Sequence, residues 1–386
     1  MVIISGPKIY AEQGILKNSA LVIQKNKIQE ILTTKKNSDA TVLTFPENYH
    51  LVPGFIDVHV HGANGSDVMD GDFSALKKMS QALAAEGTTS FLATTMTAGL
   101  EEMDHVLQNV HEFMLKQHTV SGAKILGVHL EGPFLSPTKV GAQRADKILA
   151  PNIEYFERWQ KKSGNSIKLI TIAPELPESI SFIRYLKTQN IVASIGHTDA
   201  TYAESIAAIE AGCTHVTHLY NAMRGMHQRE PGVVTAALLS DQISAELIVD
   251  GTHLHPAIVK LALKVKGSEK IILVTDAMRA KCLSDGIYDL GGQSVEVKNN
   301  IAQLADGTLA GSTLKMSSAL QNMMRFTGCD LFMAVKCASE NPARTLNVFD
   351  KKGGIAEGKD ADLVVLDDNL DVVLTMSLGE VVYRRE

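Results

Sequence analysis

The sequence predicts an α/β protein: a (β/α)8 TIM barrel that carries a small β-sandwich domain formed by the two ends of the chain. Residues 1–50 and 351–386 contain short apolar segments separated by polar turns, a pattern typical of antiparallel strands. Between these regions, near-continuous runs of Val, Ile and Leu alternate with amphipathic stretches. Such runs are typical of parallel strands that are buried on both faces and covered by helices.

The length of 386 residues allows one large domain and one small domain. We expect residues 51–350 to form the barrel, and residues 1–50 and 351–386 to form the small domain. Eight strand–helix units over about 250 residues fit a barrel. A doubly wound parallel sheet is the alternative, but it usually needs fewer units.

The barrel strands are expected, in chain order, at 51–60, 89–94, 124–130, 167–172, 191–195, 215–219, 243–249 and 270–275. Amphipathic segments between many of them predict helices at 73–86, 101–117, 177–189, 201–210 and 256–265. After the eighth strand we expect an inserted hairpin at 286–307. Closing helices are expected at 312–327 and 331–340, the second ending before Pro342.

Composition and charge exclude several classes of function. The chain is 45% hydrophobic and 21% charged, with a net charge of −6, as in an ordinary globular protein. Basic residues never form more than short pairs, so no nucleic-acid partner is expected. Apolar runs are too short for a signal segment or a membrane span, and the four cysteines show no C-x-x-C spacing. We therefore expect a cytoplasmic protein without membrane contact.

Side chains that bind metals follow the predicted barrel strands. In such barrels the catalytic residues lie at the carboxyl ends of the strands. Two histidines in the string His-Val-His-Gly end the first strand, two positions apart and so on one face. The third, fifth, sixth and eighth strands each end in one further candidate. The complete set is His59, His61, Glu131, His197, His218 and Asp276.

Each of these side chains, taken singly, is more often a structural residue than a ligand. Their coincidence at one rim favours the functional interpretation. Imidazoles with carboxylates and without thiolates are ligands for a divalent Zn, Fe, Mn or Co ion. Such an ion polarises an acyl oxygen and makes water more acidic, and Asp276 is the candidate base. The sequence therefore predicts metal-assisted hydrolysis of an amide, ester or amidine.

The strings around these residues resemble the amidohydrolase superfamily. Within it, His-Leu-Glu-Gly-Pro-Phe, Gly-His-Thr, Thr-His-Leu-Tyr-Asn-Ala-Met and Thr-Asp-Ala-Met resemble the deacetylases of amino-sugar phosphates. The match extends over nearly the whole chain, including Leu-Ala-Gly-Ser at 309–312 and the tail at 354–363.

The resemblance implies a role for each residue. Glu131, His197 and His218 would bind the principal metal, and His59 and His61 a second one. The resemblance thus implies one or two divalent ions per subunit, either Zn²⁺ or Fe²⁺. By the same resemblance, Asp276 would act as general base and then acid, while His253 would hydrogen-bond the acetyl carbonyl.

The resemblance also implies residues that bind the sugar phosphate: Ala142, Gln143, Asn221, Ala222, Arg229, His253, Leu309, Ala310 and Gly311. A guanidinium grips phosphate through paired hydrogen bonds, and in this family the arginine reaches across a dimer interface. A homodimer with Arg229 contributed by the partner is therefore implied. Gln143 is a departure at the sugar C1-hydroxyl contact, because some relatives have histidine there.

The implied reaction is hydrolysis of N-acetyl-D-glucosamine 6-phosphate to D-glucosamine 6-phosphate and acetate. Three alternatives remain at this point. The first is the galactosamine epimer of the substrate, and the second is a barrel that binds a ligand without turnover. The third is a cyclic-amide hydrolase or deaminase, which has no use for Arg229 as a phosphate clamp.

Overall fold

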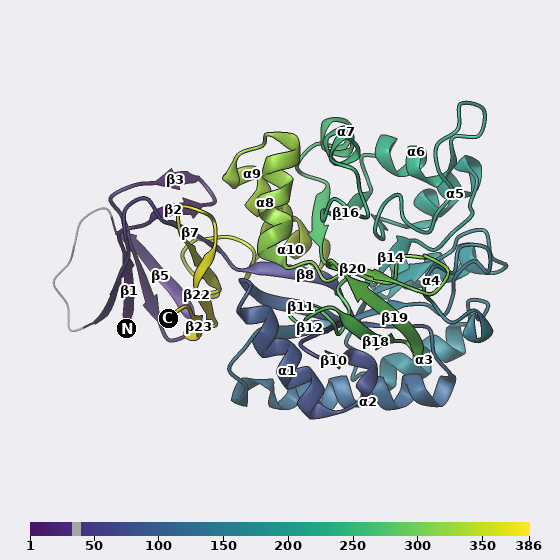
Figure 1. Ribbon diagram of the computed structural model, residues 1–386, viewed down its shortest axis with the longest axis horizontal. Helices are drawn as coiled ribbons and strands as arrows, with labels where there is room; N and C mark the ends of the chain where they lie inside the picture. The colour runs from purple at the N-terminus through teal and green to yellow at the C-terminus, as the bar shows by residue number, and fades with distance from the viewer. Residues whose placement is uncertain (33–39) are drawn as a thin grey trace.

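The computed structural model describes residues 1–32 and 40–386, and it confirms the predicted barrel. Figure 1 shows the barrel beside a small group of sheets that contains both ends of the chain. Eight parallel strands pair in sequence order. They are β8 (Phe55–Val60), β11 (Thr88–Thr95), β12 (Lys124–Glu131), β13 (Ile167–Ile172), β14 (Val192–Ile195), β15 (His215–Val216), β16 (Ser244–Ile248) and β17 (Ile271–Val274).

The barrel closes between β17 and β8 at their carboxyl ends. Val60 and Ala277 form a parallel bridge, and the Asp276 N–H donates to the His59 carbonyl at 2.8 Å. Further down, the buried Asp57 carboxylate accepts the N–H of His59 at 3.2 Å and that of Thr275 at 3.3 Å. A side chain thus completes the closure, and the end of the eighth strand is fixed against the end of the first.

Helices cover the outside of the barrel (Figure 1): α1 (Phe73–Ala84), α2 (Leu100–Lys116), α3 (Ile153–Lys162), α4 (Ser179–Thr188), α5 (Tyr202–Ala211), α6 (Gly232–Leu239), α7 (Pro256–Lys266) and α8 (Met316–Thr327). The sequence did not predict α3 and α6. Helix α3 is mostly polar and buries only Phe156 and Trp159, whereas α6 is apolar all round and shows no helical periodicity. Among the described residues, every helix is too short or too polar to cross a membrane.

The predicted single strand at 51–60 was wrong. The chain forms β7 (His50–Pro53) in the small sheets and then β8 in the barrel, with Gly54 between them. A Cβ at Gly54 would lie 2.2 Å from the Thr89 hydroxyl oxygen, so only glycine fits this close approach. One apolar run therefore serves two sheets.

The prediction that the second closing helix ends before Pro342 was wrong. Helix α9 (Leu331–Val335) continues through a π-helical segment, Lys336–Glu340, into α10 (Asn341–Thr345). Pro342 lies in the first turn of α10, directly after the π-helical segment. The insertion after β17 is a three-stranded sheet rather than a hairpin: β18 (Gly286–Leu290), β19 (Gln293–Lys298) and β20 (Ile301–Gln303).

The small domain contains two sheets with an apolar core that includes Ile4, Leu21 and Leu363. One sheet has the order β5 (Lys27–Leu32), β4 (Ala20–Gln24), β1 (Val2–Ser5), β6 (Thr41–Thr44). The other has the order β23 (Glu380–Arg384), β22 (Val372–Ser377), β21 (Leu363–Leu366), β7, β2 (Lys8–Ala11), β3 (Gly14–Leu16) and so joins both ends of the chain, as predicted. We propose that residues 1–50 and 351–386 form this domain and residues 51–350 the barrel, with β7 crossing the border.

Candidate active site

A cavity of about 480 Å³ opens at the carboxyl ends of the barrel strands. A short ribbon of β9 (Gly62–Ala63) and β10 (Ser66–Asp67) follows β8 next to this end of the barrel. The cavity brings together most of the residues that the sequence singled out. Those that line it are His61, Glu131, Ala142, Gln143, His197, His218, Asn221, Ala222, His253, Asp276, Leu309 and Gly311.

Glu131, His197 and His218 form the first group of potential metal ligands. Glu131 Oε1 lies 3.2 Å from His197 Nε2 and 3.1 Å from His218 Nε2, and the two imidazole nitrogens are 3.1 Å apart. All three side chains are buried. The three ligand atoms therefore face a single point at the bottom of the cavity.

The hydrogen bonds of His197 show that this group fits a cation. Its Nδ1 lies 2.9 Å from the carbonyl oxygen of Lys139, and a carbonyl can only accept. Nδ1 therefore carries the proton, and Nε2 presents a lone pair to Glu131 and to His218 Nε2. Lone pairs and a carboxylate that meet at such distances need a positive charge between them, which a divalent ion supplies.

His59, His61 and Asp276 form a second group beside the first. Asp276 Oδ1 lies 3.4 Å from His59 Nε2 and 3.2 Å from His61 Nε2. Glu131 also borders this group, because its Oε1 is 3.4 Å from His59 Nε2 and its Oε2 is 3.2 Å from His61 Nε2. Among the described residues, His59 Nε2 has no hydrogen-bond partner. The donors present thus also fit a second divalent ion, and Glu131 borders both groups.

The electrostatics of both groups favour positive charge. Burial opposes protonation of His61, but hydrogen bonds to Asp276 and Glu131 outweigh it and raise the pKa of His61 to about 9. Burial opposes the ionised form of Asp276, but its electrostatic interactions with His59 and His61 hold its pKa below the ordinary value. The pKa of Glu131 is likewise held well below its ordinary value by the surrounding imidazoles, against the effect of burial. The carboxylates therefore stay ionised.

Three of these residues have left-handed backbones. The φ angles of His197, His218 and Asp276 are 45°, 29° and 47°. Side chains other than glycine rarely adopt such angles, at a cost of about 1 kcal/mol or more per residue. At all three positions the strand has ended, and the left-handed residue turns its side chain over the mouth of the barrel.

His253 also lines the cavity. Its Nδ1 is 2.6 Å from Asp250 Oδ2, and Asp250 Oδ1 also accepts the backbone N–H groups of Thr252 and His253 at 2.8 Å. Burial opposes protonation of His253, but the hydrogen bond to Asp250 outweighs it, and the pKa of His253 is raised. With Nδ1–H held by Asp250, Nε2 is the nitrogen available to a ligand.

Three predicted substrate residues, Ala310, Gln143 and Arg229, differ in their surroundings from those that only line the cavity. Ala310 is fully buried and packs behind the cavity wall. Gln143 is also buried: its Nε2 donates to Glu131 Oε2 at 2.8 Å, and its Oε1 accepts the N–H of Thr97 at 2.7 Å. This amide is thus used to hold Glu131.

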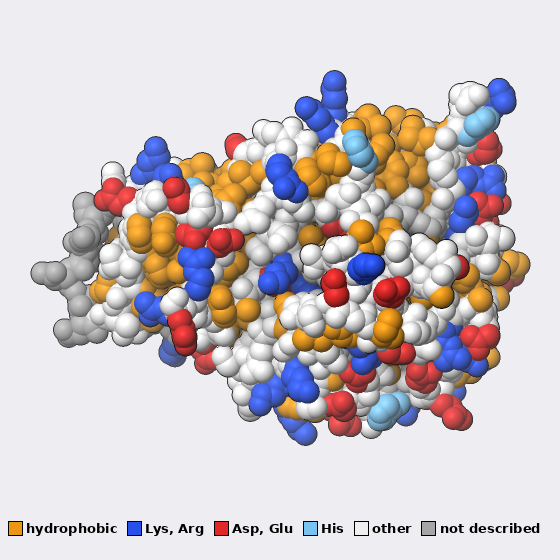
Figure 2. Space-filling model, viewed as in Figure 1, with side chains coloured by type: hydrophobic (Ala, Val, Ile, Leu, Met, Phe, Trp, Pro, Cys, Tyr) orange, Lys and Arg blue, Asp and Glu red, His pale blue; other side chains and the backbone are white. Residues whose placement is uncertain are grey.

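Arg229 is exposed and is not among the described residues that line the cavity. The loop before α6 projects beyond the barrel (Figure 1), and Figure 2 shows basic and histidine side chains at its tip. Within one copy of the chain, therefore, the arginine lies outside the cavity.

The sequence interpretation did not identify a second layer of buried polar residues. Glu246 accepts hydrogen bonds from His59 and His215, and His129 packs edge-on against His59. Lys281 pairs with Glu86 at 2.5 Å, and both side chains are almost completely buried. The sequence held one signal for this layer, because Glu246 stands inside the apolar segment Ser-Ala-Glu-Leu-Ile. A buried charge must be paired, so a carboxylate at such a position indicates buried polar partners.

The barrel and its rim of histidines and carboxylates define a class of hydrolases that act with divalent ions. The model of the amidohydrolase family matches residues 50–382. The chain is 45% identical over 377 residues to N-acetylglucosamine-6-phosphate deacetylase of Bacillus subtilis (strain 168), covering 97% of this chain and 95% of that protein. It is 38% identical over 322 residues to N-acetylgalactosamine-6-phosphate deacetylase of Escherichia coli O157:H7, covering 83% and 85%.

A solved structure gives the same result. A mutant N-acetyl-D-glucosamine-6-phosphate deacetylase from Mycobacterium smegmatis, in complex with N-acetyl-D-glucosamine-6-phosphate, superposes with a TM-score of 0.92. It is 32% identical, and the match covers 99% of each chain. The chain therefore belongs to the amidohydrolase family, as the motifs predicted.

Proposed function

We propose that the chain hydrolyses N-acetyl-D-glucosamine 6-phosphate to D-glucosamine 6-phosphate and acetate. The observation that carries this proposal is the placement of Asp276 and His253 around one cavity with two groups of potential metal ligands. The names of the similar proteins supply the substrate. We also propose that the protein acts in the cytoplasm.

Glu131, His197 and His218 would hold the principal ion, and His59 and His61, with Asp276 beside them, a second one. We propose Zn²⁺ or Fe²⁺, with one or two ions per subunit. When bound, such an ion supplies Lewis-acid polarisation of the acyl oxygen and makes water more acidic. Gln143 and Lys139 keep Glu131 and His197 in place through the hydrogen bonds given above.

Asp276 moves the proton. Its pKa is held low, so it is an acceptor at neutral pH, and Oδ1 lies within 3.4 Å of both His59 and His61. Asp276 takes the proton of the water that attacks the acetyl carbon. It then donates that proton to the amine nitrogen as the C–N bond breaks.

His253 stabilises the oxygen on which negative charge develops. Asp250 holds Nδ1–H and raises the pKa of the imidazole, which favours a proton on Nε2 as well. A fixed donor aimed at the acetyl oxygen favours the transition state over the ground state. Asp250 thus orients His253 and favours its protonated form.

For the rest of the substrate we propose contacts with Ala142, Asn221, Ala222, Leu309 and Gly311 in the cavity wall. The exposed position of Arg229 supports a homodimer in which this guanidinium reaches the phosphate bound by the partner. Ala310 would act through its neighbours, because its own side chain is buried.

The test is acetate release by purified protein from N-acetylglucosamine 6-phosphate and from unphosphorylated N-acetylglucosamine, with metal content measured on the same sample. We expect release from the phosphorylated sugar only, and loss of release on chelation. Metal-loaded protein that releases acetate from neither sugar refutes the proposal. The galactosamine epimer is the second candidate, because the Escherichia coli relative carries that name, and it is assayed in parallel.

A further inference from the structure

Glu246 connects the two groups of metal ligands from below the cavity. It lies in β16, is fully buried and does not line the cavity among the described residues. Its Oε2 accepts His59 Nδ1–H at 2.9 Å and the backbone N–H of His218 at 3.0 Å. Its Oε1 accepts His215 Nε2–H at 2.9 Å. One carboxylate thus has three donors from β8 and from β15 and the loop that follows it.

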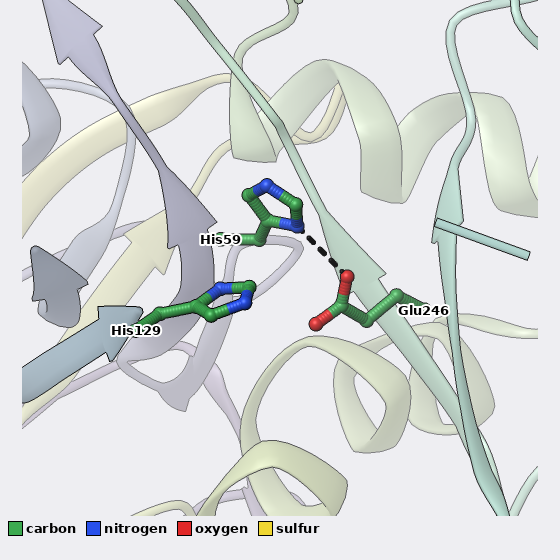
Figure 3. A group of neighbouring side chains, drawn as sticks. All are labelled: His59, His129 and Glu246. Atoms are coloured by element: carbon green, nitrogen blue, oxygen red, sulfur yellow. Dashed lines mark hydrogen bonds and ion pairs between the residues drawn. The ribbon is translucent and has the colours of Figure 1, made fainter. Parts of the chain in front are cut away.

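Figure 3 shows Glu246 with His59 and His129, a set whose donor types alone would suggest a third metal site. The hydrogen bonds of His129 argue against that interpretation. Its Nδ1 is 3.1 Å from the Val58 carbonyl and must donate, while its Nε2 is 2.7 Å from the Thr171 hydroxyl and accepts. Both nitrogens of His129 are occupied, so the set is a hydrogen-bonded support.

The first consequence concerns the proton of His59. A carboxylate cannot donate, so Glu246 fixes the proton on His59 Nδ1. The lone pair is then on Nε2, which faces Asp276 Oδ1 at 3.4 Å. An imidazole whose other nitrogen donates to a carboxylate is a more basic and better oriented ligand.

The second consequence concerns the backbone of His218. Strand β15 ends at Val216, and His218 follows with a φ of 29°. Glu246 holds this turn twice, because its side chain accepts the His218 N–H and its carbonyl accepts the Leu219 N–H at 2.9 Å. Oε2 alone therefore orients one residue of each ligand group.

We propose that Glu246 is a positioning residue that couples the two metal sites: it sets the tautomer of His59 and the orientation of His218 at the same time. This rests on the ligand roles proposed above, and it is independent of the substrate. Replacement of Glu246 should therefore weaken ion binding at both groups, although Glu246 belongs to neither.

The experiment titrates chelator-treated protein with Co²⁺ and follows the visible absorption bands, which report the number, affinity and geometry of bound ions. In Glu246→Gln we expect both affinities to fall by about 10- to 100-fold, with altered bands. Ser194→Ala is the matched control: it removes the 2.6 Å hydrogen bond to Thr217 in the same barrel interior. We expect it to lower stability and leave both affinities unchanged.

Folded Glu246→Gln protein with both Co²⁺ affinities within twofold of wild type overturns the proposal, and so does weakening confined to one site. If Glu246→Gln does not fold, imidazole nitrogen NMR of the wild-type Zn²⁺ protein decides. A proton on His59 Nδ1 supports the proposal, and a proton on Nε2 overturns it. Absence of acetate release in the assay above would leave these readouts untouched, so the two failures can be distinguished.

Discussion

Replacing Asp276 by asparagine separates proton transfer from metal binding. Asparagine has the size of aspartate and keeps one oxygen, but it cannot accept a proton at neutral pH. Asp276 belongs to the group with His59 and His61 and is not part of the group of Glu131, His197 and His218. We therefore expect the variant to keep the ion held by Glu131, His197 and His218, and to lose at most the ion held by His59 and His61.

The size of the effect follows from the role. A positioned general base contributes about 10²- to 10⁴-fold to the rate. At about 1.36 kcal/mol for each factor of ten, this corresponds to about 3 to 5 kcal/mol of activation free energy. KM should change little, because the proposed contacts to the sugar phosphate come from other residues of the wall, such as Asn221 and Ala222.

The assay measures kcat for acetate release together with bound metal by elemental analysis. Asp241→Asn, at an exposed position, is the matched control and should behave like wild type. A kcat for Asp276→Asn close to that of wild type, at unchanged metal content, would refute the assignment of the base. Loss of all metal would instead place Asp276 among the ligands of both ions.

Three further outcomes are expected. Asp250→Asn removes the group that raises the pKa of His253; since His253 acts when protonated, the alkaline limb of the kcat/KM profile should move to lower pH. Lys281→Met leaves the buried Glu86 without its cation, and at a pH where Glu86 is ionised this costs about 3 to 5 kcal/mol in the free energy of unfolding. In the wild type, burial raises the pKa of Glu86 to about 7, against the effect of Lys281. The free energy of unfolding therefore falls as the pH rises through 7, and it should fall more steeply in Lys281→Met. Urea unfolding at pH 6 and 8 checks the cost and the pH dependence, and adding Glu86→Gln to Lys281→Met should restore stability. At His197, the glycine variant should be about 1 kcal/mol more stable than the alanine variant because φ is 45°; equal stabilities in urea would contradict this.

The convergence of the metal-binding side chains was predictable because it depends on strand ends alone. In a closed parallel barrel all carboxyl ends meet at one rim, so His59, His197 and Asp276 had to approach each other once their strands were recognised. The place of Gln143 was not predictable. It depends on how the loop after β12 folds back, which brings the amide to Glu131 and to the backbone of Thr97.

The errors in the fold have physical causes of the same kind. Hydrophobic periodicity does not divide one apolar run between two sheets, and only the contact of Gly54 with Thr89 marks the break between β7 and β8. Helix α6 is apolar on all sides, so no amphipathic pattern marks it. Pro342 predicts a helix end only if the preceding helix is regular, and here a π-helical segment precedes it.

The left-handed residues of the site are held by the barrel itself. The carbonyl of His197 accepts the Ser136 N–H at 2.9 Å, and that of Asp276 accepts the Ser312 N–H at 2.7 Å. The N–H of His218 donates to Glu246. Each bond joins the strained residue to a neighbouring strand or loop, so the barrel fixes its φ angle at the expense of stability. The ligand geometry is therefore built into the backbone, and ion binding does not have to supply the free energy that organises it.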